Sequence, residues 1–310
     1  MSEIFVTPDL QQADTLLTEL LEDVKQNAGF FSGGENIPLP KSAAAVKNIL
    51  DTKVRFGSPY SKLVHLTEET FKLSGTELNG IYQQQMHNQY DFYYMTLSVD
   101  LIPKPGAKFW RLTCEMDFGP KGSSEPIVQT IFPKDKWREV MNFGVGMDLG
   151  LDGSLDWSAG VDSSQLTQLM GNSNIPVEVK AKVANKDGFK AFIAVPAYKY
   201  ELGQSQILAS GEDNSVCYWR IQDQELQKIG TMKFATVFKV PKGVECITLR
   251  SIAWAEPNMD WLTADVRDVL RALQGKFRSL INSGEEGASQ LARGVGEQWT
   301  LTLPKAVQSA

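Results

Sequence analysis

FGVGMDLGLDGSLDWSAGV, residues 143–161, separates two kinds of side chain more cleanly than any other part of the chain. Apolar residues alternate with residues that are small or acidic. Because successive side chains of a β-strand point to opposite faces, this alternation predicts an amphipathic β-hairpin that turns near Asp152 and Gly153. The apolar positions are Phe143, Val145, Met147, Leu149, Leu151, Leu155, Trp157, Ala159 and Val161.

The register of this hairpin follows from the rule that directly opposed residues of an antiparallel pair share a face. A two-residue turn at Asp152 and Gly153 would oppose Leu149 and Asp156, which mixes the faces. A three-residue loop at 152–154, or a five-residue loop at 150–154, keeps apolar residues opposite one another. We favour the three-residue loop, which places Leu149 opposite Trp157.

Similar alternation predicts further strands along the chain. Residues 93–101 and 110–118 are expected to form a second hairpin in which Val99 pairs with Trp110. Residues 177–183 should pair with 189–195, and shorter strands follow as far as residue 254, with turns at 211–214 and 241–243. Short strands separated by regular turns are typical of a β-sandwich.

Helical patterns lie outside this β region. Apolar stripes at 10–24 and 42–50 predict two amphipathic helices near the N-terminus, and 76–89 predicts a weaker third. The strongest stripe runs from about 260 to 281. We expect its Leu270, Leu273 and Phe277 to pack against a β domain or a second subunit.

These patterns define the expected fold class and its regions. We predict a mainly β (α+β) protein in which antiparallel hairpins form one or two β-sandwich-like domains, with amphipathic helices at the N- and C-terminal ends. The regions are a helical N-terminal part with a Gly/Pro connector (1–90), a first antiparallel β region (91–170), a second β-sandwich-like region (171–257) and a C-terminal helix with a tail (258–310).

Composition restricts the partners and the compartment. The net charge is −6, and no run concentrates Lys or Arg, so we expect no nucleic-acid partner. No leader or membrane-spanning apolar run is evident, which makes the cytoplasm the default expectation. The three cysteines, Cys114, Cys217 and Cys246, are far apart on predicted strands, and we expect them to be buried and reduced.

The residues that usually carry chemistry are scarce. His65 and His87 are the two histidines, and the nucleotide-loop, nucleophile-elbow and zinc motifs are absent from the sequence. The glycines at 144, 146 and 150 are spaced GxGxxxG inside a strand pattern, so we reject a dinucleotide loop there. Asp148, Asp152 and Asp156 are weak candidates for a Ca²⁺ site, because the pattern lacks the closing Glu of an EF-hand. We therefore expect no cofactor.

Three functions are compatible with the sequence. The first is a non-enzymatic interaction or assembly protein that binds a protein partner or itself through β-domain surfaces and terminal helices. The second, ranked below it, is a membrane-inserting, pore-forming protein that uses the hairpin at 143–161. The third is a carboxylate-based enzyme, which requires that Asp or Glu side chains converge in a pocket.

Overall fold

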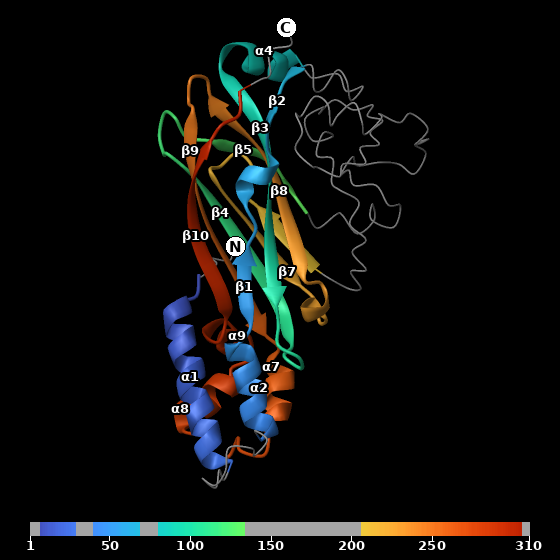
Figure 1. Cartoon of the computed structure of the whole chain (residues 1–310), viewed down its shortest axis with the longest axis vertical. Helices are drawn as coiled ribbons and strands as arrows, with labels where there is room; N and C mark the ends of the chain where they lie inside the picture. The colour runs from blue at the N-terminus through green and yellow to red at the C-terminus, as the bar shows by residue number, and fades with distance from the viewer. Residues whose placement is uncertain (1–6, 29–39, 69–79, 134–205, 306–310) are drawn as a thin grey trace, which may run out of the picture.

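Two five-stranded antiparallel sheets pack face to face along most of the computed structural model (Figure 1). The structure describes residues 7–28, 40–68, 80–133 and 206–305. Sheet A has the order β1-β3-β8-β5, with β2 also beside β3, and sheet B has the order β10-β9-β4-β7-β6. The predicted fold class, mainly β with helices from both ends of the chain, is confirmed.

The core lies between the two sheets and continues into the helices at one end of the sandwich. Aromatic rings from opposite sheets meet between the sheets, since Phe118 lies 4.8 Å from Phe238, and Trp219 lies 5.0 Å from Phe234, measured between ring centroids. All four side chains are fully buried. The strands of sheet A are β1 (Lys53–Phe56), β2 (Leu63–Leu66), β3 (Tyr90–Ile102), β5 (Ile127–Phe132) and β8 (Thr231–Pro241). Those of sheet B are β4 (Phe109–Gly119), β6 (Gln206–Ser210), β7 (Val216–Gln222), β9 (Cys246–Pro257) and β10 (Arg293–Thr302).

The predicted hairpin between residues 93–101 and 110–118 is wrong in its pairing, although both strands exist. Val99 pairs with Met232 in sheet A, whereas Leu112 pairs with Ile221 and Ala255 in sheet B. The two strands therefore face each other across the core. Alternation fixes which side of each strand is buried, but it is satisfied equally by a neighbour in the same sheet and by one in the opposite sheet.

The helices occupy the two ends of the sandwich. Those formed by the chain termini gather at one end, and α4 (Gly80–Asn88) lies at the other (Figure 1). The first group comprises α1 (Leu10–Asn27), α2 (Lys41–Leu50), α7 (Met259–Asp265), α8 (Gly275–Asn282) and α9 (Glu285–Gln290). Two short 3-10 turns, η1 (Pro59–Lys62) and η3 (Leu226–Lys228), complete the described elements.

The predicted single helix from 260 to 281 is divided into α7 and α8, so its continuity was wrongly predicted. Polar partners satisfy backbone groups at the break. The Gln274 amide donates to the Asp23 carboxylate over 2.9 Å, and the Arg278 guanidinium donates to the carbonyls of Arg271 and Leu273. The predicted apolar positions still pack within the chain: Leu273 and Phe277 are buried in the core, and the half-buried Leu270 packs against it.

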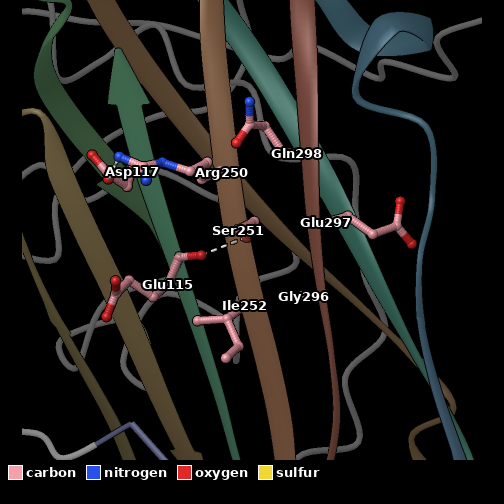
Figure 2. A pocket seen from close by; sticks show the side chains of 8 residues that line it. All are labelled: Glu115, Asp117, Arg250, Ser251, Ile252, Gly296, Glu297 and Gln298. Atoms are coloured by element: carbon pink, nitrogen blue, oxygen red, sulfur yellow. Dashed lines mark hydrogen bonds and ion pairs between the residues drawn. The ribbon is translucent and has the colours of Figure 1, made fainter. Parts of the chain in front are cut away.

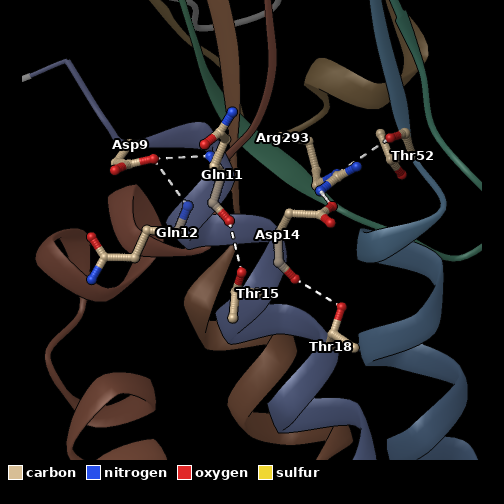
Figure 3. Close-up of polar contacts among 8 residues, drawn as sticks. All are labelled: Asp9, Gln11, Gln12, Asp14, Thr15, Thr18, Thr52 and Arg293. Atoms are coloured by element: carbon tan, nitrogen blue, oxygen red, sulfur yellow. Dashed lines mark hydrogen bonds and ion pairs between the residues drawn. The ribbon is translucent and has the colours of Figure 1, made fainter.

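A polar network fixes α1 against the sandwich (Figure 3). Asp9 caps α1 by accepting from the amides of Gln11 and Gln12 at 3.0 Å. Arg293 at the start of β10 pairs with Asp14 of α1 at 2.5 Å. Beside it, a Cβ on Gly294 would lie 2.8 Å from Leu10 and 2.6 Å from the Ala253 carbonyl oxygen, so glycine permits this close approach.

The cysteines are free, and two of them fulfil the prediction of burial. Cys114 and Cys217 are fully buried in sheet B, whereas Cys246 is exposed at the first residue of β9. The expectation for Cys246 was therefore wrong, because a strand end lacks the covering neighbours of a strand interior. The predicted hairpins at 143–161 and 177–195 and the boundary near residue 171 lie outside the described residues.

Candidate functional site

The chain between β5 and β6 is attached to the sandwich at two edge strands. β5 ends the order of sheet A, and β6 ends the order of sheet B. Residues 133–205, which include the amphipathic stretch at 143–161, thus leave from the edge of one sheet and return to the edge of the other. We call the junction of β5 with the β6–β7 turn the attachment edge.

Backbone hydrogen bonds join the two sheets at the attachment edge. The Val128 amide donates to the Asn214 carbonyl, and the Asp213 amide donates to the Val128 carbonyl, each over 2.8 Å. The turn reaches this position through unusual backbone angles: φ is 62° at Asp213 and 122° at Gly211. A Cβ on Gly211 would lie 2.4 Å from the Cys217 Cα atom, so the turn also requires glycine for its close approach.

Side chains reinforce the same edge. Ser215 donates to the Glu125 carboxylate, and Lys121 donates to the Ser215 hydroxyl, both over 2.5 Å. Lys121 also pairs with Asp117 of β4 at 2.6 Å. Hydrogen bonds to Ser215 and Lys121 lower the pKa of the half-buried Glu125 carboxyl. The attachment edge is therefore held by its own contacts.

A shallow depression of about 450 Å³ lies on the outer face of sheet B (Figure 2). Its acidic groups include Glu115 and Asp117, which come from alternate positions of β4 and so share a face. Arg250 pairs with Asp117 at 3.2 Å, while Glu297 points away from the others (Figure 2). The lining residues are Glu115, Asp117, Arg250, Ser251, Ile252, Gly296, Glu297 and Gln298.

The chemistry available in this depression is limited. Burial, with a smaller contribution from Asp117, raises the pKa of Glu115. Asp117 is engaged by Arg250 and Lys121, and the Ser251 hydroxyl donates to the Glu115 backbone carbonyl. Two carboxylates, those of Glu115 and Asp117, therefore lie near each other. The neighbours of Asp117 are cations, however, and the Ser251 hydroxyl donates to a backbone carbonyl and not to a carboxylate.

Among the described residues, the most deeply buried ion pair joins Arg111 to Glu256. Arg111 Nε and Nη2 donate to one Glu256 oxygen, and Trp254 Nε1 donates to the other over 3.1 Å. Glu285, which is 71% exposed, accepts from Arg111 Nη1. Burial raises the pKa of Glu256, and the bonds to Arg111 oppose that rise. Because these groups satisfy one another, they leave little capacity for a ligand.

The two histidines lie on different elements. His65 lies on β2, where its ring stacks on Tyr93 and its Nε2 lies 3.7 Å from Asp91. His87 lies near the end of α4. Among the described residues, no group of three or more His, Cys, Asp or Glu side chains is arranged to hold a metal ion. The weak Ca²⁺ candidates Asp148, Asp152 and Asp156 fall outside the described residues.

The candidate residues identified in the sequence therefore fall into two groups: those that the structure describes and those that it does not. Leu270, Leu273 and Phe277 lie in or against the core, whereas the candidates at 143–161 are not described. Sequence reasoning missed the attachment edge, although it identified the turn at 211–214 that helps to form it. No helix in the described ranges is long and apolar enough to cross a membrane.

Comparisons with known proteins give distant similarities. No family model and no curated protein matches the chain. Among solved structures, a chain described as "Pore forming protein" has 8% identity and a TM-score of 0.31, covering 66% of this chain and 78% of its own. Clostridium perfringens delta-toxin has 9% identity with the same TM-score and coverage. The Staphylococcus aureus collagen adhesin has 10% identity and a TM-score of 0.21, covering 54% of this chain and 38% of its own. At these TM-scores the similarities carry no argument.

Proposed function

We propose that the protein is not an enzyme and acts by assembly on a membrane. In this proposal the described sandwich is the fixed body, and the hairpin at 143–161 is the element that inserts. The proposal joins the assembly function expected from the sequence to the membrane alternative. The observation that carries it is the attachment of residues 133–205 at the edge strands of two different sheets.

The described sandwich supports this division of roles because its two sheets are joined by contacts between described residues. Rings from β4 and β7 pack on rings from β8 across the core, and backbone bonds join β5 to the β6–β7 turn. A segment attached at an edge can change its contacts without separating paired central strands. A central insertion would instead break a ladder of hydrogen bonds.

The sequence at 143–161 supports the choice of the inserting element. The predicted strands, 143–151 and 155–161, are nine and seven residues long, near the roughly 9–11 residues that cross a bilayer when tilted. One face carries only apolar side chains, and the other carries glycine, serine and aspartate. Lipid would accept the first face, and water would accept the second.

Insertion would require several copies of the chain. A lone hairpin leaves the backbone groups on its two outer edges without partners, and each such group costs several kcal/mol in hydrocarbon. Hairpins from neighbouring copies can satisfy these edges. Self-association is therefore part of the proposal.

The described surface gives less support to assembly through the terminal helices. Leu273 and Phe277 are each 1% exposed, so they are already used inside the chain. The large apolar side chains that the described residues do expose come from separate elements: Tyr60, Ile81, Ile102, Leu208 and Val216. Scattered apolar residues of this kind are normal on a soluble surface.

A leakage assay tests the proposed function. The full chain is added to liposomes loaded with a dye, over a range of pH and lipid composition, and compared with Leu149→Arg and Asp148→Arg. Leu149→Arg should strongly reduce leakage, because arginine on a lipid-facing strand costs roughly 2–4 kcal/mol near the bilayer centre. Asp148→Arg places the same side chain on the polar face and should retain leakage.

Circular dichroism establishes that both variants keep the fold of the parent chain. Absence of leakage by the parent chain under every condition would overturn the proposal, and so would equal leakage by the two variants.

A further inference from the structure

The outer face of sheet A is apolar and buried. Tyr93 points into the core, so the alternation of β3 places Tyr94 on the outer face. Tyr94 pairs with Val64 of β2 and with Val237 of β8, and Val237 pairs with Thr130 of β5, which gives one row across four strands. Their exposed fractions are 7% for Tyr94, 8% for Val64, 0% for Val237 and 4% for Thr130.

A second outer row extends this face. Thr96 pairs with Ala235, which pairs with Phe132, and all three side chains are buried. The following row, Ser98 with Lys233, is polar and half-buried. We call the two buried rows the outer patch of sheet A: Val64, Tyr94, Thr96, Thr130, Phe132, Ala235 and Val237.

Side chains on the outer face of a sheet remain exposed at their tips when only neighbours in the same sheet surround them. The outer patch is buried, so another segment of the chain must cover it. Among the described helices, α4 packs on β3, and its Tyr82 ring meets Phe92 at 6.4 Å beyond one end of the patch. The helices formed by the chain termini lie at the opposite end of the sandwich (Figure 1).

We propose that the hairpin at 143–161 docks on the outer patch of sheet A when the protein is in water. Its apolar face would lie on Tyr94, Val237 and Phe132, and its glycine and aspartate face would be directed to solvent. The choice of occupant rests on the proposed function, which requires this hairpin to be sheltered until it reaches a membrane.

The position of the attachment edge favours this occupant. β5 ends at Phe132, which belongs to the outer patch, and ten residues lie between Phe132 and Phe143. Ten residues can span at most about 33–36 Å, so the hairpin can reach any part of the patch. The predicted hairpin at 177–195 is instead close in sequence to Gln206 at the edge of sheet B.

Docking would bury two apolar surfaces against each other, the apolar face of the hairpin and the outer patch. The hairpin face is free of charge, and the outer patch consists of apolar side chains and threonines. Burial of both is favoured, because it removes apolar surface from water. Release of the hairpin at a membrane would therefore expose the outer patch.

Disulfide cross-linking in the full chain tests the docking. Cys246→Ser removes the exposed thiol, while Cys114 and Cys217 remain buried. Thr130→Cys or Ala235→Cys supplies one anchor on the outer patch. The second cysteine replaces Met147, Leu149 or Leu155 on the apolar face, or Asp148, Ser154 or Asp156 on the polar face. The proteins are oxidised in buffer without lipid, and intramolecular disulfides are detected by mass spectrometry.

We expect disulfides from the apolar-face positions and at least ten-fold lower yields from the polar-face positions. The matched control places the anchor at Leu208, which is 42% exposed on β6, and should give no such disulfide. The proposal is overturned if no apolar-face position reacts with either anchor, if the two faces react equally, or if Leu208→Cys reacts as well as Thr130→Cys.

Other results of the two experiments distinguish a failure of the docking inference from a failure of the proposed function. Disulfides to Val179→Cys or Ile193→Cys, without any to 147, 149 or 155, would assign the outer patch to the other predicted hairpin and overturn the docking. Because the experiment contains no lipid, leakage without cross-linking contradicts only the docking. Cross-linking without leakage contradicts only the membrane function.

Discussion

The Val128 amide donates to the Asn214 carbonyl over 2.8 Å and thereby joins an edge strand of sheet A to the β6–β7 turn of sheet B. The adjacent Asp213 amide returns a bond to the Val128 carbonyl. The two sheets are therefore closed at the edge where residues 133–205 are attached. The proposed movement of the hairpin can occur outside this closure.

The conformation of Asp213 gives the first prediction. Its φ of 62° lies in the left-handed region, which Asp and Asn tolerate and β-branched residues do not. Asp213→Val should lower the free energy of unfolding by about 1–2 kcal/mol. Asp213→Asn removes the same charge but keeps the tolerance, so it should remain close to the parent in urea unfolding. Equal losses in the two variants would show that the charge, and not the backbone, matters.

The partners of Arg111 give the second prediction. Glu256→Ala would leave Arg111 and the Trp254 indole without their buried acceptor, and it should cost about 3–5 kcal/mol of stability. Glu285→Ala removes an acceptor that is 71% exposed, so it should cost no more than about 1 kcal/mol. Denaturant unfolding of both variants checks this difference, and similar losses would contradict the assignment of Glu256 as the buried partner.

The sequence predicts which face of each strand is buried better than it predicts which strands pair with one another. The alternation in β3 and β4 identifies Leu97 and Leu112 as core residues, yet it does not determine whether the strands are neighbours in one sheet or face each other from two. The helix break depends on Asp23, which contacts Gln274 from a distant part of the chain. The outer patch was not recognisable, because a buried apolar residue such as Val237 resembles any other strand residue until the sheet order is known.

Acidification should destabilise the fold through His65. Burial lowers the pKa of His65 from 6.5, and Asp91 opposes this shift only in part. The unfolded chain therefore binds a proton at higher pH than the folded chain. Stability that is present above pH 6.5 is lost as the pH falls below 6.5 and through the folded pKa.

His65→Phe keeps an aromatic ring beside Tyr93 but cannot be protonated. Unfolding should be measured in buffers from about pH 7 to about pH 5, the range in which histidine titrates. The parent chain should lose more stability than His65→Phe over this range. Glu115 and Glu256 have raised pKa values and act in the opposite direction at lower pH, but they are common to both proteins. Parallel pH profiles would exclude His65 as the cause.

Thiol reactivity should distinguish one cysteine from the other two. Burial raises the pKa of Cys114 to about 12 and that of Cys217 well above its usual range, whereas Cys246 is exposed. Since the thiolate is the reactive form, the Cys246 thiol should react quickly with a disulfide reagent in the native state. The other two should react only after denaturation. Replacing Cys246 with serine should remove the fast phase, and a fast phase that persists would contradict the assignment.

The central claim is that residues 143–161 enter a membrane as a two-faced hairpin. An environment-sensitive fluorophore attached to single cysteines at successive positions, in a Cys246→Ser background, reports the surroundings of each residue with and without liposomes. We predict a blue shift and quenching by lipid-borne quenchers at 145, 147, 149, 155 and 157, with little change at 146, 148, 150, 156 and 158, because lipid and water contact opposite faces of a spanning strand. A uniform response along the segment, or no response to liposomes at any position, would contradict the claim.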